Sequence, residues 1–119
     1  MASILVVDDD KQVRDILQTF LEREGYNVTA TKGGREAIRS AIVNDFDLII
    51  TDLIMPGGGG LDEVSYLDEA EFNLKVIVIS GYLTENNVRE LKTYKTVFKI
   101  LEKPVKLDIL STVVKQALQ

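Results

Sequence analysis

The chain has 119 residues, of which 45% are hydrophobic and 28% charged, and its 14 basic and 19 acidic side chains give a net charge of −5. This length and composition predict one globular domain, over residues 1–119, with a core large enough to fold without disulfide or metal crosslinks. The acidic balance disfavours binding to nucleic acid or to an anionic membrane, and the lack of cysteine and histidine excludes thiolate sites, imidazole sites and Ser-His-Asp catalysis.

Strand and helix patterns alternate in the first half of the chain. The apolar run at residues 4–7 predicts a buried strand. It is too short for a signal or membrane-spanning segment, so we expect a cytoplasmic protein. A first helix is predicted from apolar residues at helical spacing: Val13, Ile16, Leu17, Phe20 and Leu21. Asp10 is expected to cap the start of this helix and Gly25 to end it. Residues 26–30 alternate as in a weaker strand. A second helix is predicted from Ala37, Ile38, Ala41 and Ile42.

The same alternation continues to the C-terminus. Short segments rich in apolar residues at 46–50, 76–79 and 97–101 predict strands that are buried on both faces, as in a parallel sheet. Helices are predicted around Leu61, Val64 and Leu67, over residues 84–93, and around Leu107, Leu110, Val114 and Leu118. Five alternating strands and helices predict an α/β fold, a doubly wound parallel sheet with helices on both faces. Functional side chains in such folds lie beyond the carboxyl ends of the strands.

Chemically active side chains stand at four of these strand ends. They are Asp8, Asp9 and Asp10 after the first strand, Asp52 after the third, Ser80 after the fourth and Lys103 after the fifth. Clustered carboxylates need a cation, and oxygen ligands suit a hard ion such as Mg²⁺, which Mn²⁺ can replace. The charge of −3 on Asp8, Asp9 and Asp52 would be balanced by Mg²⁺ and Lys103.

This combination is suited to phosphoryl transfer. A carboxylate can accept a phosphoryl group covalently, which makes Asp52 a candidate acceptor. The phosphoryl group would add a charge of about −1.5 to −2. The metal and Lys103 can stabilise that charge as it develops, and Ser80 can donate a hydrogen bond to the new oxygens.

The motifs at the strand ends resemble the receiver domains of two-component response regulators. They are Val-Val-Asp-Asp at residues 6–9, Asp-Leu-Ile-Met-Pro at 52–56, Ser80 after Val-Ile-Val-Ile, and Glu-Lys-Pro at 102–104. Their order and spacing match over essentially the whole chain. The resemblance implies the flavodoxin-like (βα)5 receiver fold and a regulatory switch, not an enzyme with an external product.

The resemblance also implies a role for each residue. Asp52 is the phosphoacceptor, Lys103 contacts the phosphoryl group and Ser80 is the switch hydroxyl. The implied donor is a histidine kinase or a histidine phosphotransfer protein. Phosphorylation is then expected to change the face made by the last strand and the last two helices, which controls a downstream protein or effector domain.

The implied metal site consists of Asp8, Asp9, Asp52 and the backbone carbonyl of Ile54, with Asp9 as the preferred direct acid ligand of Mg²⁺. The Lys103–Pro104 bond is expected to be cis. The domain itself is expected to bind neither nucleic acid nor membrane. It is expected to be a monomer or a dimer that forms on phosphorylation.

Three positions depart from the family pattern: Gly59, Ile100 and Val105. Gly59 replaces the usual polar residue before the glycine that opens the third helix, within a run of glycines at 57–60 that is expected to be mobile. Ile100 stands where the family has its switch aromatic. Val105 stands where an aromatic residue commonly follows Lys-Pro. These changes leave the phosphorylation chemistry unaffected, but they bear on how the signal reaches the output face.

Two other functions remain open. A receiver-like interaction module would have the same residues and would not be phosphorylated by any donor. A Mg²⁺-dependent phosphohydrolase with an aspartyl nucleophile commonly has a second Asp two residues later, where this chain has Ile54. A flavin mononucleotide site is rejected because the three acids at residues 8–10 would repel its phosphate.

Overall fold

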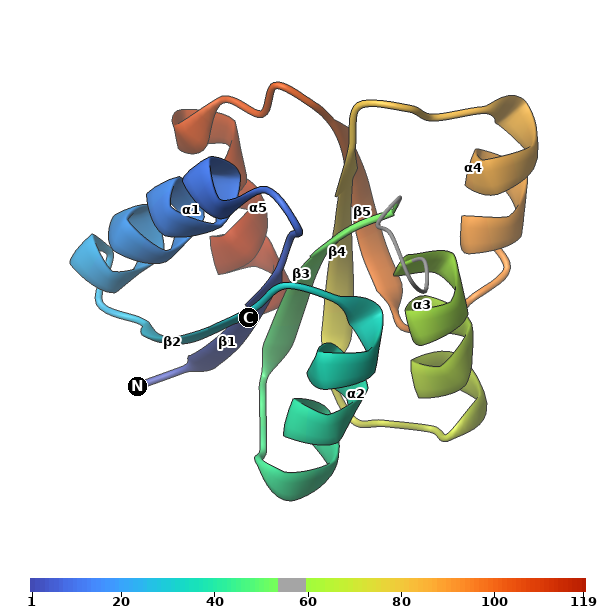
Figure 1. Cartoon of the computed structure of the whole chain (residues 1–119), viewed down its shortest axis with the longest axis horizontal. Helices are drawn as coiled ribbons and strands as arrows, with labels where there is room; N and C mark the ends of the chain where they lie inside the picture. Colours follow the sequence, from blue (N-terminus) through green and yellow to red (C-terminus); the bar gives the residue numbers. More distant parts are fainter. Residues whose placement is uncertain (54–59) are drawn as a thin grey trace.

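A computed structural model describes residues 1–53 and 60–119 of the chain. Within these residues, five parallel strands form one sheet in the order β2-β1-β3-β4-β5 (Figure 1). The strands are β1 (Ser3–Val7), β2 (Asn27–Thr31), β3 (Leu48–Asp52), β4 (Lys75–Ser80) and β5 (Val97–Glu102). The helices are α1 (Lys11–Arg23), α2 (Gly34–Val43), α3 (Gly60–Glu69), α4 (Glu85–Leu91) and α5 (Leu107–Ala117). The predicted doubly wound α/β fold is therefore confirmed.

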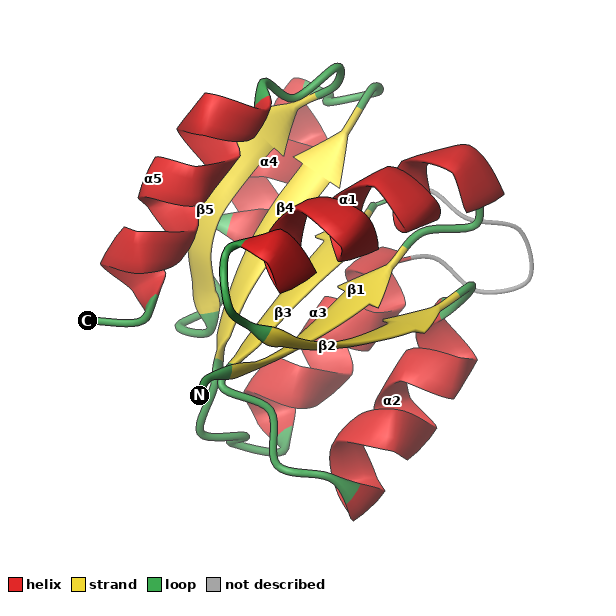
Figure 2. Ribbon diagram, turned by 90° about the vertical axis from the view of Figure 1, so that its left-hand side faces the viewer, coloured by secondary structure: helices red, strands yellow, loops and turns green. Residues whose placement is uncertain are grey.

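The helices divide between the two faces of the sheet, so that α1 and α5 cover one face and α2, α3 and α4 cover the other (Figure 2). Side chains of the central strands alternate between two apolar clusters. On β3, for example, Ile50 packs in the cluster with α1 and α5, while Ile49 packs in the cluster with α2, α3 and α4. This burial on both faces explains the continuous apolar runs of β1, β3 and β4.

The expectation of burial on both faces was wrong for β5. This strand is half-buried along most of its length, and Lys99 and Glu102 are exposed. β5 lies at the edge of the sheet that the described residues form, and its one partner among them is β4. Position in the sheet, and not the run of residues 97–101, therefore determines its burial.

The start and the end of α1 agree with the sequence prediction, whereas some apolar side chains of α1 and α2 are exposed. Asp10 caps α1, and Gly25 follows its end with a φ of +97° that glycine adopts without strain. Ile16 and Ile42, which belong to the apolar patterns that predict these helices, are 55% and 59% exposed. A helix packed on one face of a sheet buries a narrow stripe, such as Leu17 and Leu21 on α1, and apolar residues beside it stay in contact with solvent.

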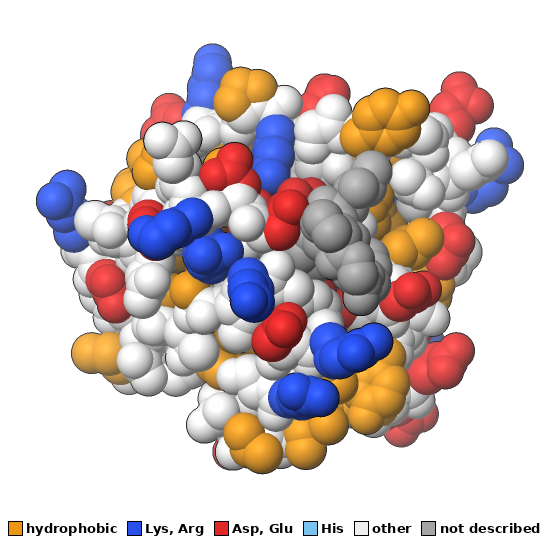
Figure 3. Space-filling model, in the orientation of Figure 1, with side chains coloured by type: hydrophobic (Ala, Val, Ile, Leu, Met, Phe, Trp, Pro, Cys, Tyr) orange, Lys and Arg blue, Asp and Glu red, His pale blue; other side chains and the backbone are white. Residues whose placement is uncertain are grey.

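The surface carries charges of both signs. Acidic and basic side chains are interspersed with hydrophobic ones over the face shown in Figure 3. Among the described residues, no helix has the length and apolar character needed to cross a membrane.

We predict that Asp10→Ala destabilises the fold by about 0.5–2 kcal/mol, because it removes the N-cap of α1. Asp10 Oδ1 accepts hydrogen bonds from the backbone N–H groups of Gln12 at 2.9 Å and Val13 at 3.4 Å. Urea unfolding in the presence of Mg²⁺ measures the loss. The control is Asp15→Ala, which removes only an exposed ion pair with Lys11 and should lose less than about 0.5 kcal/mol. Equal losses in the two variants would contradict the capping role.

Candidate functional site

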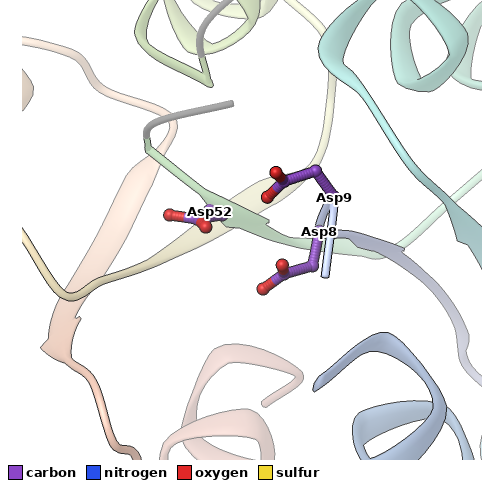
Figure 4. Close-up of side chains that lie close together, drawn as sticks. All are labelled: Asp8, Asp9 and Asp52. Atoms are coloured by element: carbon purple, nitrogen blue, oxygen red, sulfur yellow. The ribbon is translucent and has the colours of Figure 1, made fainter. Parts of the chain in front are cut away.

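Three carboxylates meet at the carboxyl ends of β1 and β3 (Figure 4). Asp8 and Asp9 directly follow β1, and Asp52 is the last residue of β3. One carboxylate oxygen from each lies within 4.8 Å of the others, so the cluster can hold a single ion. Asp8 and Asp52 are buried, whereas Asp9 is exposed.

Lys103, which directly follows β5, bridges two of these acids. Its Nζ donates hydrogen bonds to Asp8 Oδ2 and to Asp52 Oδ2, each at 2.9 Å. Burial lowers the pKa of the Lys103 ammonium, but hydrogen bonding and charge interactions with Asp8 and Asp52 outweigh burial and raise the pKa overall. Lys103 therefore stays charged at neutral pH. The expected cis bond between Lys103 and Pro104 is present.

The acids differ in how firmly the protein holds them. Asp8 accepts a hydrogen bond from the Asp10 backbone N–H on Oδ1 at 2.9 Å, while Lys103 occupies Oδ2. The Asp8 backbone carbonyl also accepts a hydrogen bond from Arg14 at 2.7 Å. The Asp9 carboxylate has no such partner within the described part of the chain. Asp9 is thus the acid of the cluster that is least engaged and most open to an added ligand.

Ser80 is placed at the same edge of the sheet. It is the buried last residue of β4, the strand between Asp52 and Lys103 in sheet order. The Ser80 carbonyl accepts from the Lys103 backbone N–H at 2.9 Å, and Ser80 Oγ accepts from the Tyr82 N–H at 3.1 Å. The hydroxyl is therefore tied to the loop that precedes α4, while the Tyr82 side chain is 67% exposed.

Two expectations fall on residues outside the described ranges: the carbonyl of Ile54 as a metal ligand, and the glycine loop that contains Gly59. Ile100, at the position of the family's switch aromatic, is half-buried against the apolar cluster under α2, α3 and α4.

The donor set and charge of the cluster fit a divalent cation. Three carboxylates and the Lys103 ammonium leave a charge of −2 at the site, since −3 + 1 = −2. Oxygen-only ligands are those that Mg²⁺ and Mn²⁺ prefer. Asp8, Asp9 and Asp52 are therefore the residues that could hold such an ion.

The comparisons with known proteins identify the family. The sequence model of the family described as "Response regulator receiver domain" matches residues 4–115. The chain belongs to this family. Response regulator SaeR of Staphylococcus aureus is 37% identical over 87 residues, which make up 73% of this chain and 38% of SaeR. The chain therefore covers well under half the length of this curated relative.

Solved structures of receiver proteins agree closely with the fold. The response regulator receiver protein from Pseudomonas putida has 30% identity and a TM-score of 0.92, covering 97% of this chain and 96% of that one. Response regulator TrrA from Thermotoga maritima, solved in complex with Mg²⁺-BeF, has 29% identity and a TM-score of 0.88, covering 99% and 100%. A CheY-like receiver domain protein from Methanospirillum hungatei has 25% identity and a TM-score of 0.94, covering 99% and 94%.

These findings confirm the predicted family and its flavodoxin-like fold. Receiver domains are regulatory parts of two-component systems, and phosphorylation switching is their general function. The family binds Mg²⁺ at an acidic pocket, and its general partners are histidine kinases and effectors.

Sequence reasoning missed Glu63, a buried acid on α3. Its side chain is 1% exposed, although a glutamate is usually assigned to the solvent. Burial raises its pKa to about 8, against a smaller lowering by a hydrogen bond with Thr51. One signal was present, because Glu63 stands four residues before Leu67 and thus on the same face of the helix as that core residue.

We predict that Glu63 makes the fold less stable as pH rises from about 4.5 to about 8. In this window the folded state holds a proton that the unfolded state has released, so the free energy of unfolding falls with increasing pH and levels off above it. Wild type should lose roughly 2–4 kcal/mol relative to Glu63→Gln between pH 5 and pH 8.5. Urea unfolding of both proteins at several pH values tests this. Parallel curves would show that Glu63 does not hold a proton in the folded state.

Proposed function

We propose that this chain is a phosphorylation-activated switch in which Asp52 accepts a phosphoryl group from the phosphohistidine of a kinase or phosphotransfer protein. The observation that carries the proposal is the double hydrogen bond of Lys103 to Asp8 and Asp52, beside the open carboxylate of Asp9. These contacts bring three carboxylates and a fixed positive charge together at one edge of the sheet, which supports the proposal.

In the transfer step, an oxygen of the Asp52 carboxylate forms a bond to phosphorus as the phosphorus–nitrogen bond breaks. The electron pair of that bond returns to the imidazole nitrogen of the donor. The product adds a charge of about −1.5 to −2 at Asp52. Lys103, already within hydrogen-bonding distance of Asp52 Oδ2, is positioned to stabilise that charge.

Asp8, Asp9 and Asp52 are the proposed ligands of Mg²⁺, or of Mn²⁺ in its place, together with the backbone carbonyl of Ile54. When bound, the ion stabilises negative charge that develops on the phosphoryl oxygens. Asp9 is proposed as the principal acid ligand because both carboxylate oxygens of Asp8 already accept hydrogen bonds, one from the Asp10 backbone N–H and one from Lys103.

Ser80 is the proposed link to the output face. A hydroxyl can donate to a phosphoryl oxygen while it accepts a hydrogen bond from Tyr82. Because Ser80 Oγ accepts from the Tyr82 N–H, movement of Ser80 toward the phosphoryl group would displace the loop before α4. We propose that the face formed by α4, β5 and α5 changes in this way and controls a partner or an effector domain.

The assignment of the acceptor predicts the result of a direct labelling experiment. Incubation with acetyl phosphate and Mg²⁺ should add one phosphoryl group to wild type, and Asp52→Asn should remain unmodified because its amide is not a nucleophile. Intact-protein mass spectrometry measures both products. Asp47→Asn, which changes an exposed acid before β3, is the control and should be labelled like wild type. Equal labelling of wild type and Asp52→Asn would rule out Asp52 as the acceptor.

The metal assignment predicts how melting responds to Mg²⁺. Binding to the folded state alone raises stability by about 1.4 kcal/mol at ten times the dissociation constant, so Mg²⁺ should raise the Tm of wild type by several degrees. Asp9→Ala should lose most of this rise, whereas Asp15→Ala, on the exposed side of α1, should keep it. Calorimetry with and without Mg²⁺ measures the difference. A full rise in Asp9→Ala would show that Asp9 is not a ligand.

A further inference from the structure

Glu63 lies directly beneath the strand that ends in Asp52. Glu63 Oε1 is 3.1 Å from Oγ1 of Thr51, the residue before Asp52 on β3. Glu63 Oε2 is buried and has no hydrogen-bond partner among residues 1–53 and 60–119. Among the described residues, the Glu63 carboxyl therefore has one polar contact in an otherwise apolar layer. That contact is with Thr51 on β3, the strand that ends in the proposed acceptor.

The Thr51 hydroxyl lies between two acceptors. Its Oγ1 is 3.1 Å from Glu63 Oε1 and 3.0 Å from the backbone carbonyl oxygen of Asp52. A hydroxyl has only one proton to donate, so it cannot donate to both oxygens at once. Both hydrogen bonds form together only if Glu63 supplies a proton of its own and donates to Thr51, which then donates to the Asp52 carbonyl.

The surroundings of α3 favour this neutral acid. The charged side chains of the elements around it are Arg35, Glu36 and Arg39 on α2, Asp52 on β3, Lys75 on β4, Glu85, Arg89 and Glu90 on α4, and Asp62, Asp68 and Glu69 on α3 itself. The helical residues of this set are exposed or half-exposed, and Lys75 stands at the opposite end of the sheet from Thr51. Within the described residues none of them forms an ion pair with Glu63, so ionisation would leave a buried charge without a counter-ion.

We propose that Glu63, as a neutral carboxylic acid, is a positioning residue for phosphorylation: by donating to Thr51 it frees the Thr51 proton for the carbonyl of Asp52 and so fixes the end of β3. This inference rests on the proposed function of Asp52 as the acceptor. It gives the acceptor a second support, from the layer under α2, α3 and α4, in addition to Lys103 at the edge of the sheet.

Ionisation of Glu63 reverses the direction of the hydrogen bond. The carboxylate then takes the Thr51 proton, and the Asp52 carbonyl loses its donor from Thr51. The peptide that joins Asp52 to Leu53 becomes less well held, and the acceptor is less well oriented. Loss of the proton from Glu63 therefore slows phosphorylation of Asp52, which makes the rate of the switch dependent on pH.

The test is the initial rate of phosphorylation by acetyl phosphate with Mg²⁺, followed by intact mass from about pH 6.5 to pH 9.5. Glu63→Gln keeps a side-chain N–H that can donate to Thr51 at every pH. The rate of wild type divided by that of Glu63→Gln should fall about threefold or more across this range. Effects of pH on the donor and on Lys103 are common to both proteins and cancel in the ratio.

Three further variants separate positioning from general packing. Thr51→Val should slow phosphorylation, and its rate divided by that of Glu63→Gln should no longer fall as pH rises. Thr51→Ser should recover both the rate and its fall with pH, because the hydroxyl returns. Glu69→Gln, the same change at an exposed position of α3, should keep the wild-type pH profile. Circular dichroism at each pH confirms that the proteins compared are folded.

The outcomes distinguish the inference from the function on which it rests. A constant ratio with normal labelling of Asp52 overturns the role of Glu63 and leaves the proposed function intact. A fall in the ratio that persists in Thr51→Val also overturns it, because the effect would then not pass through Thr51. No labelling of Asp52 in wild type at any pH overturns both.

Discussion

The double hydrogen bond from Lys103 to Asp8 and Asp52 joins the ends of three strands that are far apart in the sequence. A parallel sheet brings its carboxyl ends to one edge, and here this places three acids side by side. Their repulsion would oppose folding without a fixed positive charge. The Lys103 ammonium provides that charge. It leaves the site with a charge of −2, which one divalent cation would neutralise, so the same ammonium both stabilises the fold and sets the charge that a metal ion would meet.

The alternation of side chains along β3 separates two kinds of chemistry. Asp52 lies among charged side chains at the open edge, whereas Thr51 points into the layer under α2, α3 and α4 with Glu63. Adjacent residues thus contact media of very different polarity. In the second environment, burial raises the pKa of the Glu63 carboxyl and favours its neutral form.

Most of the fold and of the candidate site could be predicted from the sequence, because strand order and chain direction are strongly constrained in a β-α repeat. Asp8, Asp52 and Lys103 were expected to converge from topology alone. Ile16 belongs to the apolar pattern of α1 and is nevertheless exposed, because periodicity does not define the width of a buried stripe. Residues 97–101 were misjudged because a segment rich in apolar residues was assigned to a central strand, although Lys99 within it is typical of an edge strand. Glu63 was missed because its residue type favours solvent, and only the three-dimensional packing shows otherwise.

The edge position of β5 has a consequence for association with other chains. One side of this strand pairs with β4, and within the described residues no strand covers the other side. Such an edge can recruit a foreign strand and begin aggregation. The exposed charges of Lys99 and Glu102 oppose that kind of pairing, since a second strand laid alongside would bring them into a drier environment. This edge is therefore poorly suited to extension of the sheet by a second chain.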